Sequence, residues 1–239
     1  MGALSTVFID VGGVLWHFHD EERAWLERAR RLAEATALSD GQVDTLLSAL
    51  HDRTATVSEL ERFDVVATVR DVVADLKLDA LDLAAVRRAM CVPAAGWVQQ
   101  DPGIGTFLAS LRALGLGRVI LSNVVWRAAE DYWRDFAEIG VAHDIDAVVS
   151  SLDALVRKPN PLIFQIALGA AGSPLPSTCV MIGDTEDKDI APARALGMYT
   201  IRMAPDGAES VADAVVGSLG EAAGIIAAWD EDPPGSPAD

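Results

Sequence analysis

Positive charge is scarce in this sequence. Nineteen lysine and arginine residues stand against 36 aspartate and glutamate residues, which gives a formal net charge of −17 over 239 residues. Such a chain repels nucleic-acid phosphates and anionic lipid headgroups, so we expect neither nucleic acid nor a membrane as a partner. The same field repels a small phosphorylated ligand, so a site for one needs local positive charge from a lysine or a metal ion.

Cysteines and long apolar runs are also lacking. The two cysteines, Cys91 and Cys179, lie far apart, with neither the number for a disulfide framework nor the spacing of a metal site. No run is long enough to cross a bilayer. The apolar start of the chain has no basic residue before Asp10 interrupts it, unlike a signal peptide. These absences predict a cytoplasmic protein.

What the sequence does have is an alternation of strand and helix patterns. Short apolar runs, several of them β-branched, predict buried strands at residues 6–9, 119–121, 147–149, 180–182 and 199–203. Apolar residues at helical spacing predict helices at residues 107–114, 127–139, 161–171 and 189–196. The alternation predicts an α/β fold with a Rossmann-like, doubly wound parallel sheet, which binds ligands outside the carboxyl ends of its strands.

One long segment departs from this alternation. Residues 17–97 are rich in Ala, Leu, Glu and Arg, carry apolar residues at helical spacing and show few strand signals, which predicts an all-helical insert. The core then consists of residues 1–16 and 98–229. The last residues, 230–239, are acidic and rich in proline, so we expect a disordered tail there.

Polar residues that suit phosphoryl transfer fall where such a sheet places its ligand, most of them at or near the ends of predicted strands. They are Asp10, Ser122, Asn123, Lys158, Asp184 and Asp189. A carboxylate can attack phosphorus, a lysine and a divalent cation can neutralise the phosphoryl oxygens, and a hydroxyl can orient them. Two or three carboxylates can also bind Mg²⁺, which prefers oxygen ligands. Each of these residues alone is typical of an ordinary turn or loop. Only their joint pattern indicates a functional site.

Four motifs, in order along most of the chain, resemble those of the haloacid dehalogenase superfamily. Residues 8–15 resemble its nucleophile motif, residues 121–123 its second motif, residues 157–161 its lysine motif and residues 182–189 its metal motif. One motif alone would be weak evidence, but four in order are strong. The resemblance implies a hydrolase in which the helical insert is a cap domain that closes over the site and selects the substrate.

The resemblance also implies roles for individual residues. Asp10 would be the nucleophile that forms an aspartyl-phosphate, and Lys158 would neutralise charge. The substrate-binding residues would be Ser122, Asn123 and Gly13. The Mg²⁺ ligands would be Asp10, the backbone carbonyl of Gly12, Asp184 and Asp189. The implied reaction is Mg²⁺-dependent hydrolysis of a small phosphorylated metabolite, with sugar phosphates among the candidates.

Gly12 departs from the pattern of the superfamily's phosphatases. They usually carry there a second aspartate, which protonates the leaving group and then activates water, and such help is worth about 10² to 10⁴ in rate. Three explanations stay open. The substrate has a good leaving group, as in a sugar 1-phosphate or an acyl phosphate. His17 or His19 substitutes, although we favour surface or hinge roles for both. The reaction is that of a 2-haloacid dehalogenase, which the intact acidic motif disfavours because those enzymes need no metal.

A further alternative is a catalytically weakened member of the superfamily that binds a metabolite or a protein. Gly12 keeps this alternative open, whereas the intact Asp10, Lys158 and Asp184 argue against it. We expect a small phosphorylated molecule as the substrate, and a homodimer is an assembly that the sequence leaves open. We expect the tryptophans to pack in the core or in the insert rather than to line a substrate pocket. Among them, Trp16 and Trp97 flank the insert and are the likelier contacts with substrate.

Overall fold

The computed structural model describes residues 3–18, 21–55 and 63–235. The strands are β1 (Thr6–Ile9), β2 (Trp16–Phe18), β3 (Val98–Gln100), β4 (Gly117–Ser122), β5 (Ala147–Ser150), β6 (Cys179–Gly183), β7 (Tyr199–Met203) and β8 (Ala214–Val216). The α-helices are α1 (Glu21–Thr36), α2 (Asp40–Ala55), α3 (Val65–Asp75), α4 (Leu83–Met90), α5 (Ile104–Ala113), α6 (Ala129–Glu138), α7 (Ser151–Ala154), α8 (Pro161–Ala170), α9 (Ala191–Ala195) and α10 (Leu219–Glu231). A π-helical turn, Glu186–Ile190, precedes α9.

The centre of the fold is a six-stranded sheet with the order β5-β4-β1-β6-β7-β8 and parallel pairing throughout. Strand β1 lies between β4 and β6, and Ile9 is level with Ile120 on one side and Ile182 on the other. The carboxyl ends of these three strands therefore meet at one edge of the sheet, where a ligand site is expected. The predicted doubly wound parallel core is confirmed.

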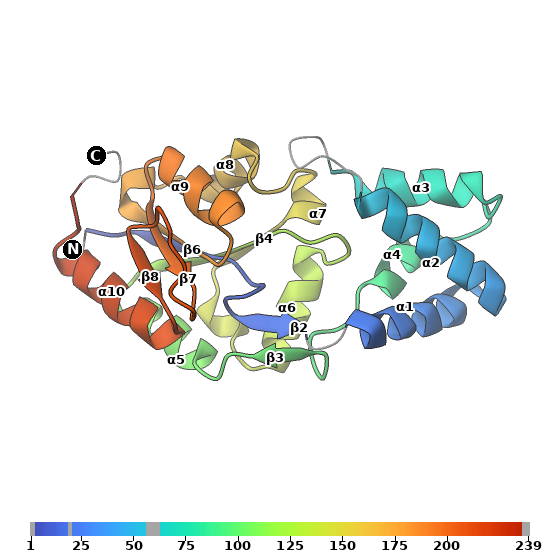
Figure 1. Cartoon of the computed structure of the whole chain (residues 1–239), viewed down its shortest axis with the longest axis horizontal. Helices are drawn as coiled ribbons and strands as arrows, with labels where there is room; N and C mark the ends of the chain where they lie inside the picture. The colour runs from blue at the N-terminus through green and yellow to red at the C-terminus, as the bar shows by residue number, and fades with distance from the viewer. Residues whose placement is uncertain (1–2, 19–20, 56–62, 236–239) are drawn as a thin grey trace.

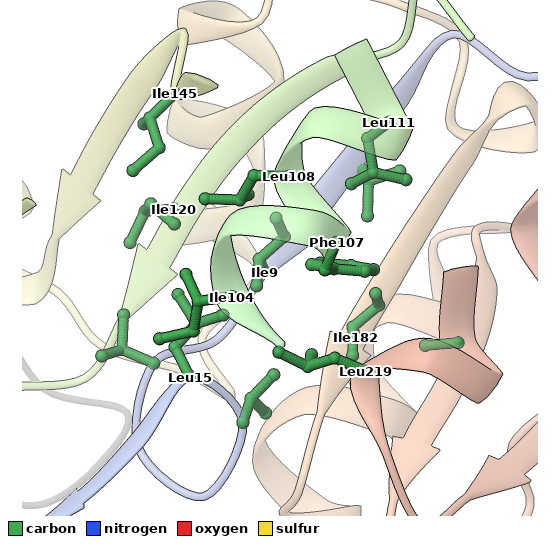
Figure 2. Close-up of a cluster of buried hydrophobic side chains, with 14 of the residues drawn as sticks. Ile9, Leu15, Ile104, Phe107, Leu108, Leu111, Ile120, Ile145, Ile182 and Leu219 are labelled. Atoms are coloured by element: carbon green, nitrogen blue, oxygen red, sulfur yellow. The ribbon is translucent and has the colours of Figure 1, made fainter. Parts of the chain in front are cut away.

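Alternate side chains of the buried strands feed two apolar layers, one on each face of the sheet. Val7 and Ile9 belong to the cluster beneath α5, α6 and α10, whereas Phe8 belongs to the cluster beneath α8 and α9. Figure 2 shows the first cluster, in which Phe107 and Leu108 of α5 pack toward Ile9 and neighbouring strand residues. Burial of each such side chain contributes roughly 1.5–3 kcal/mol, so both helical layers are firmly attached to the sheet.

Helices α1 to α4 form a separate group beyond one end of the sheet (Figure 1). Their apolar residues make a core of their own, in which Leu46, Leu47 and Leu50 of α2 are completely buried against residues of α3 and α4. Asp64 caps the start of helix α3, because its carboxylate accepts a hydrogen bond from the backbone N–H of Ala67. The predicted all-helical insert is confirmed, and it is called the cap below.

A two-stranded antiparallel ribbon joins this cap to the core. Trp16 of β2 lies opposite Gln100 of β3, and Phe18 lies opposite Val98. Both crossings of the chain between core and cap therefore run side by side. The ribbon did not appear among the strands expected from the sequence, because three residues are too few to show an alternating pattern. We propose that the domain boundaries, expected near residues 17 and 97, fall in this ribbon.

The C-terminal helix α10 was not among the helices predicted from the sequence, and it extends into the predicted tail. Helix α10 continues to Glu231, so the tail predicted from residue 230 is wrong for its first two residues. Asp230 accepts hydrogen bonds from the backbone N–H groups of Ala3 and Leu4, which ties the helix end to the first described residues of the chain. Residues 236–239 of the predicted tail lie outside the described residues. Across the described ranges, no helix combines the length and apolarity needed to cross a membrane.

Candidate active site

The predicted catalytic groups converge on a cleft of about 260 Å³ at the carboxyl edge of the sheet. Asp10 directly follows β1, Ser122 ends β4, Asp184 directly follows β6, and Lys158 comes from the loop that precedes α8. The residues that line the cleft are Asp10, Gly12, Ser122, Asn123, Lys158, Asp184, Thr185, Lys188 and Asp189. Sequence reasoning did not single out Thr185 and Lys188, although both lie inside the metal motif. The strand register explains why residues so far apart in sequence meet.

Lys158 is the central cation of the cleft and is almost fully buried. Its Nζ lies 2.7 Å from Oδ1 of Asp10 and 2.5 Å from Oδ1 of Asp189, and it donates to the carbonyl oxygen of Leu121 at 3.0 Å. An ammonium has three N–H donors, and these contacts use all of them. Burial by itself lowers the pKa of Lys158, but the two carboxylates outweigh it and raise that pKa. The lysine is thus a fixed positive charge.

Asn123 holds the backbone of Lys158 in place. Its side-chain Nδ2 donates to the Lys158 carbonyl oxygen and its Oδ1 accepts from the Lys158 backbone N–H, both at 2.8 Å. The side-chain amide of Asn123 therefore uses one N–H donor and its oxygen to hold the backbone of Lys158. Asn123 still lines the cleft. The structure gives Asn123 a positioning function beside the substrate contact predicted for it.

The cleft has more negative than positive charge around Asp10. Burial raises the pKa of Asp10 to about 7, the Lys158 ammonium opposes this rise, and the carboxylates of Asp189 and Asp184 add to it. One ligand oxygen from each of the three carboxylates lies within 4.8 Å of the others. Three close carboxylate oxygens are a donor set that fits a hard divalent cation such as Mg²⁺, which would relieve their repulsion.

The two carboxylates of the metal motif are held differently. Asp189 is buried, and its Oδ2 accepts from the backbone N–H of Thr185 at 3.1 Å while its Oδ1 is bound by Lys158. Asp184 is only half-buried, and its Oδ1 accepts from the hydroxyl of Thr185 at 3.0 Å. Asp184 is therefore the more open of the two carboxylates, and Asp189 the more deeply buried.

The two glycines after the nucleophile differ sharply in the space around them. Gly13 has a φ of +73°, and a Cβ placed on it would come within 2.2 Å of Oδ2 of Asp184. Only glycine fits there, and Gly13 leaves room for that carboxylate rather than lining the cleft. Gly12 has no atom within 4 Å of the position of a Cβ, so a side chain could be placed there. The absence of an aspartate at Gly12 is therefore not imposed by crowding.

Two further sequence candidates that the structure describes, His17 and Trp16, do not line the cleft. His17 is exposed on β2 and does not line the cleft, and His19 lies outside the described residues. Trp16 is buried and packs on Tyr132 and Phe136, with ring centroids 6.1 Å and 5.3 Å apart. The expectation that Trp16 contacts substrate is therefore wrong, because its ring belongs to the core.

A second cavity, of about 310 Å³, lies between the cap and the loop that follows β4. Its lining residues are Arg28, His51, Thr54, Ala55, Met90, Cys91, Val92, Val124, Val125, Trp126 and Arg127. The loop runs from Asn123, which lines the cleft, directly to Val124, which lines this cavity, so one loop contributes to both spaces. Trp126 is the tryptophan that lines this cavity. No motif marks these residues, because the cavity forms only when the cap packs on the core.

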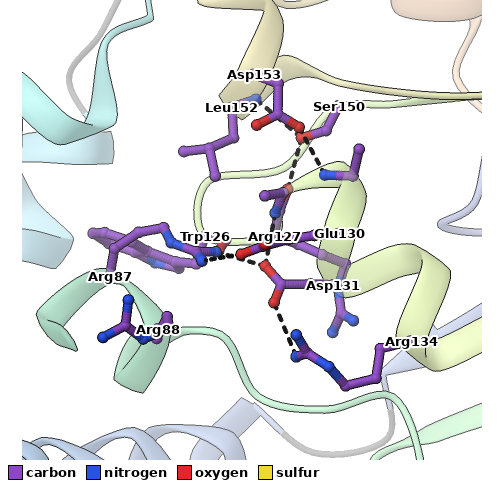
Figure 3. Close-up of polar contacts among 12 residues, drawn as sticks. Arg87, Arg88, Trp126, Arg127, Glu130, Asp131, Arg134, Ser150, Leu152 and Asp153 are labelled. Carbon is purple, nitrogen blue, oxygen red and sulfur yellow. Dashed lines mark hydrogen bonds and ion pairs between the residues drawn. The ribbon is translucent and has the colours of Figure 1, made fainter. Parts of the chain in front are cut away.

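An arginine of the cap ties α4 to the start of α6 (Figure 3). Arg87 donates to Oδ2 of Asp131 at 2.5 Å and to the carbonyl oxygen of Trp126 at 3.1 Å, and it pairs with Glu130 at 3.0 Å. Burial would raise the pKa of Asp131, but hydrogen bonds from the Ala128 N–H and from Arg87 hold that pKa below its usual range. This charged contact fixes one wall of the second cavity.

Comparison with known proteins identifies the family. The family described as haloacid dehalogenase-like hydrolase matches residues 4–197, and the chain belongs to that family. A phosphoserine phosphatase of Thermus thermophilus is 33% identical over 125 residues, which are 50% of this chain and 48% of that protein. A glyceraldehyde 3-phosphate phosphatase of Methanopyrus kandleri is 35% identical over 107 residues, 45% of this chain and 44% of that protein. The chain thus spans about half the length of the curated relatives it matches.

Solved structures show the same fold over most of the chain. A 2-haloacid dehalogenase from Pseudomonas syringae superposes with a TM-score of 0.66 at 21% identity, over 95% of this chain and 99% of that one. A phosphatase of the same family from Thermococcus onnurineus superposes with a TM-score of 0.59 at 20% identity, over 95% and 99%. At such identities the similarity concerns the fold alone. The two structures are those of a dehalogenase and a phosphatase, so the fold does not distinguish between these reactions.

Proposed function

We propose that this protein is a Mg²⁺-dependent phosphomonoesterase that hydrolyses a small phosphorylated metabolite through an aspartyl-phosphate on Asp10. The observation that carries the proposal is the buried pair of Asp10 and Lys158 beside two further carboxylates in a single cleft. The phosphatases similar to this chain support the same chemistry. A small substrate fits the size of the two adjoining spaces, about 260 and 310 Å³.

In the first step, an oxygen of the Asp10 carboxylate attacks phosphorus and the bond from phosphorus to the leaving oxygen breaks. The Ser122 hydroxyl, which lines the cleft, donates a hydrogen bond to a phosphoryl oxygen. The positive charge of Lys158 stabilises the negative charge of Asp10 and of the phosphoryl group. Mg²⁺, held by Asp10, the Gly12 carbonyl, Asp184 and Asp189, would neutralise the phosphoryl oxygens. In the second step, water attacks phosphorus and the bond from phosphorus to the Asp10 oxygen breaks, which regenerates the Asp10 carboxylate and gives inorganic phosphate. The proton that the water loses passes to the solvent.

The leaving group would occupy the second cavity, which begins where the loop leaves the cleft at Asn123. Its mixed lining, with Trp126 and valines beside Arg28 and His51, suits a small organic group with polar or anionic substituents. Gly12 provides no acid for the departing oxygen. We therefore propose that the natural substrate has a leaving group that departs without protonation, such as the one in a sugar 1-phosphate or an acyl phosphate.

Phosphate release from a substrate panel tests this proposal. We expect release from acyl phosphates and sugar 1-phosphates in Mg²⁺ and little release from simple alkyl phosphates, because only the former have good leaving groups. Chelation of the metal should abolish turnover, and readdition of Mg²⁺ should restore it. Equal rates across the panel would contradict the leaving-group argument, and turnover that persists in a chelator would contradict the metal site.

Dehalogenation is the second candidate, because a 2-haloacid dehalogenase shares the fold and such an enzyme would also use a carboxylate nucleophile. The charge of the cleft argues against it. Asp184 and Asp189 lie next to Asp10, and they would repel the carboxylate of a 2-halo acid. Halide release from 2-chloropropionate in the presence of chelator would favour dehalogenation, whereas its absence together with phosphate release would favour the phosphatase.

A further inference from the structure

Ser122 has a buried partner that belongs to none of the four motifs. The hydroxyl of Tyr132, on α6, donates to Oγ of Ser122 at 2.7 Å, and both side chains are almost fully buried, with exposures of 1% and 3%. Ser122 lines the catalytic cleft, whereas Tyr132 lies beneath it in the apolar cluster under α5, α6 and α10. Tyr132 is therefore connected to the cleft only indirectly, through its hydrogen bond to Ser122.

The direction of this hydrogen bond matters for catalysis. A serine hydroxyl has one proton to donate and two lone pairs that accept. Because the tyrosine donates, one lone pair of Ser122 is occupied and its own proton stays available for another acceptor. Burial raises the pKa of Tyr132, so the phenol keeps its proton at neutral pH. Because Ser122 lines the cleft, a phosphoryl oxygen bound there would be an acceptor for its proton.

The ring of Tyr132 is held on several sides, which makes the position of its hydroxyl precise. It stacks on Phe136 at 5.8 Å and on Trp16 at 6.1 Å, with interplanar angles of 18° and 22°. The guanidinium of Arg127 lies 5.3 Å from the ring centroid. Trp16 begins the ribbon that leads to the cap, and Arg127 also donates to the Val92 carbonyl oxygen on the chain's return from it.

We propose that Tyr132 is a positioning residue that fixes the Ser122 hydroxyl with its proton directed at the phosphoryl group of the substrate. The proposal rests on the phosphatase function proposed above. Tyr132 does not touch the substrate itself. Its effect should therefore appear in phosphate binding and should depend entirely on the presence of the Ser122 hydroxyl.

A double-mutant cycle tests this inference on the Mg²⁺-loaded full chain. Tyr132→Phe keeps the ring and its stacking but removes the hydroxyl that donates to Ser122. The fold should therefore persist, and thermal unfolding of the variant checks this. Loss of one hydrogen bond should raise the KM for the substrate and the inhibition constant for inorganic phosphate roughly three- to tenfold, with kcat changed less. In a Ser122→Ala background the same substitution should have no further effect. Tyr199→Phe is the matched control, since Tyr199 is the other tyrosine and its hydroxyl bonds Pro234 instead.

The possible outcomes separate this inference from the proposed function. If Tyr132→Phe weakens phosphate binding equally with and without the Ser122 hydroxyl, or leaves it unchanged, Tyr132 does not act through Ser122 and the inference is overturned. If the wild type hydrolyses no phosphate ester, the proposed function fails, and calorimetric binding of inorganic phosphate to the same four variants decides the inference. Non-additive loss of that binding supports it, and absence of phosphate binding overturns both.

Discussion

Gly12→Asp should raise the turnover of simple alkyl phosphates by about 10²- to 10⁴-fold, the usual contribution of a general acid. The substitution restores the carboxylate that is missing two residues after the nucleophile. A Cβ at Gly12 meets no atom within 4 Å, and the backbone there is not left-handed, so the first atom of the new side chain needs no rearrangement. Acyl phosphates should gain little, because their leaving group needs no proton.

The measurement compares kcat/KM for an alkyl and an acyl phosphate in the wild type and the variant. Gly13→Ala is a matched control one residue away. Its Cβ would come within 2.2 Å of Oδ2 of Asp184 at a φ of +73°, so this variant should lose activity with both substrates. A Gly12→Asp variant that gains nothing on alkyl phosphates would show that protonation of the leaving group is not what limits this enzyme.

Lys158→Met should lower the free energy of unfolding of the metal-free protein by about 3–5 kcal/mol, the usual effect of removing one partner from a buried ion pair. Nζ of Lys158 pairs with Asp10 at 2.7 Å and with Asp189 at 2.5 Å, and all three side chains are buried. Methionine has similar length and leaves no donor. Two carboxylates then remain buried without their cation.

The loss should depend on pH in a defined direction. Asp10 already has a pKa raised to about 7, and without the ammonium that opposes this rise it should titrate higher still. A raised pKa stabilises the folded protein at low pH, and this stability is lost as pH rises through the folded value. The destabilisation should therefore be larger at pH 8 than at pH 5.

Urea unfolding of chelator-treated protein at both pH values measures the effect of Lys158→Met. Lys77→Met, at an exposed position of the cap, is the control and should change stability little at either pH. A variant as stable as the wild type at pH 8 would mean that Lys158 does not compensate the buried carboxylates.

The sequence predicted the core of the site because each motif is tied to a strand end. Once β1, β4 and β6 are placed side by side, Asp10, Ser122 and Asp184 must meet at one edge of the sheet. The helical insert could also be predicted from the sequence, since Leu46, Leu47 and Leu50 show helical spacing. Local patterns were sufficient wherever the functional residue and the element that positions it are neighbours in sequence.

Contacts between elements that are distant in sequence could not be predicted from local patterns. Tyr132 has the pattern of an ordinary core aromatic of α6, and only the packing of that helix under β4 brings its hydroxyl to Ser122. Trp16 was misjudged for the same reason: its place at the edge of the insert suggested a substrate contact, but its ring turns inward onto Tyr132 and Phe136. The second cavity likewise exists only between cap and core.

Acid quenching during steady turnover of an acyl phosphate, followed by mass spectrometry of the peptide that contains Asp10, tests the central claim most directly. We predict that this peptide gains the mass of one phosphoryl group in the wild type. In Asp10→Asn, which keeps the shape of the residue but not its nucleophile, the peptide should stay unmodified and phosphate release should stop. An unmodified Asp10 during turnover, together with an Asp10→Asn variant that still releases phosphate, would contradict the assignment of Asp10 as the nucleophile.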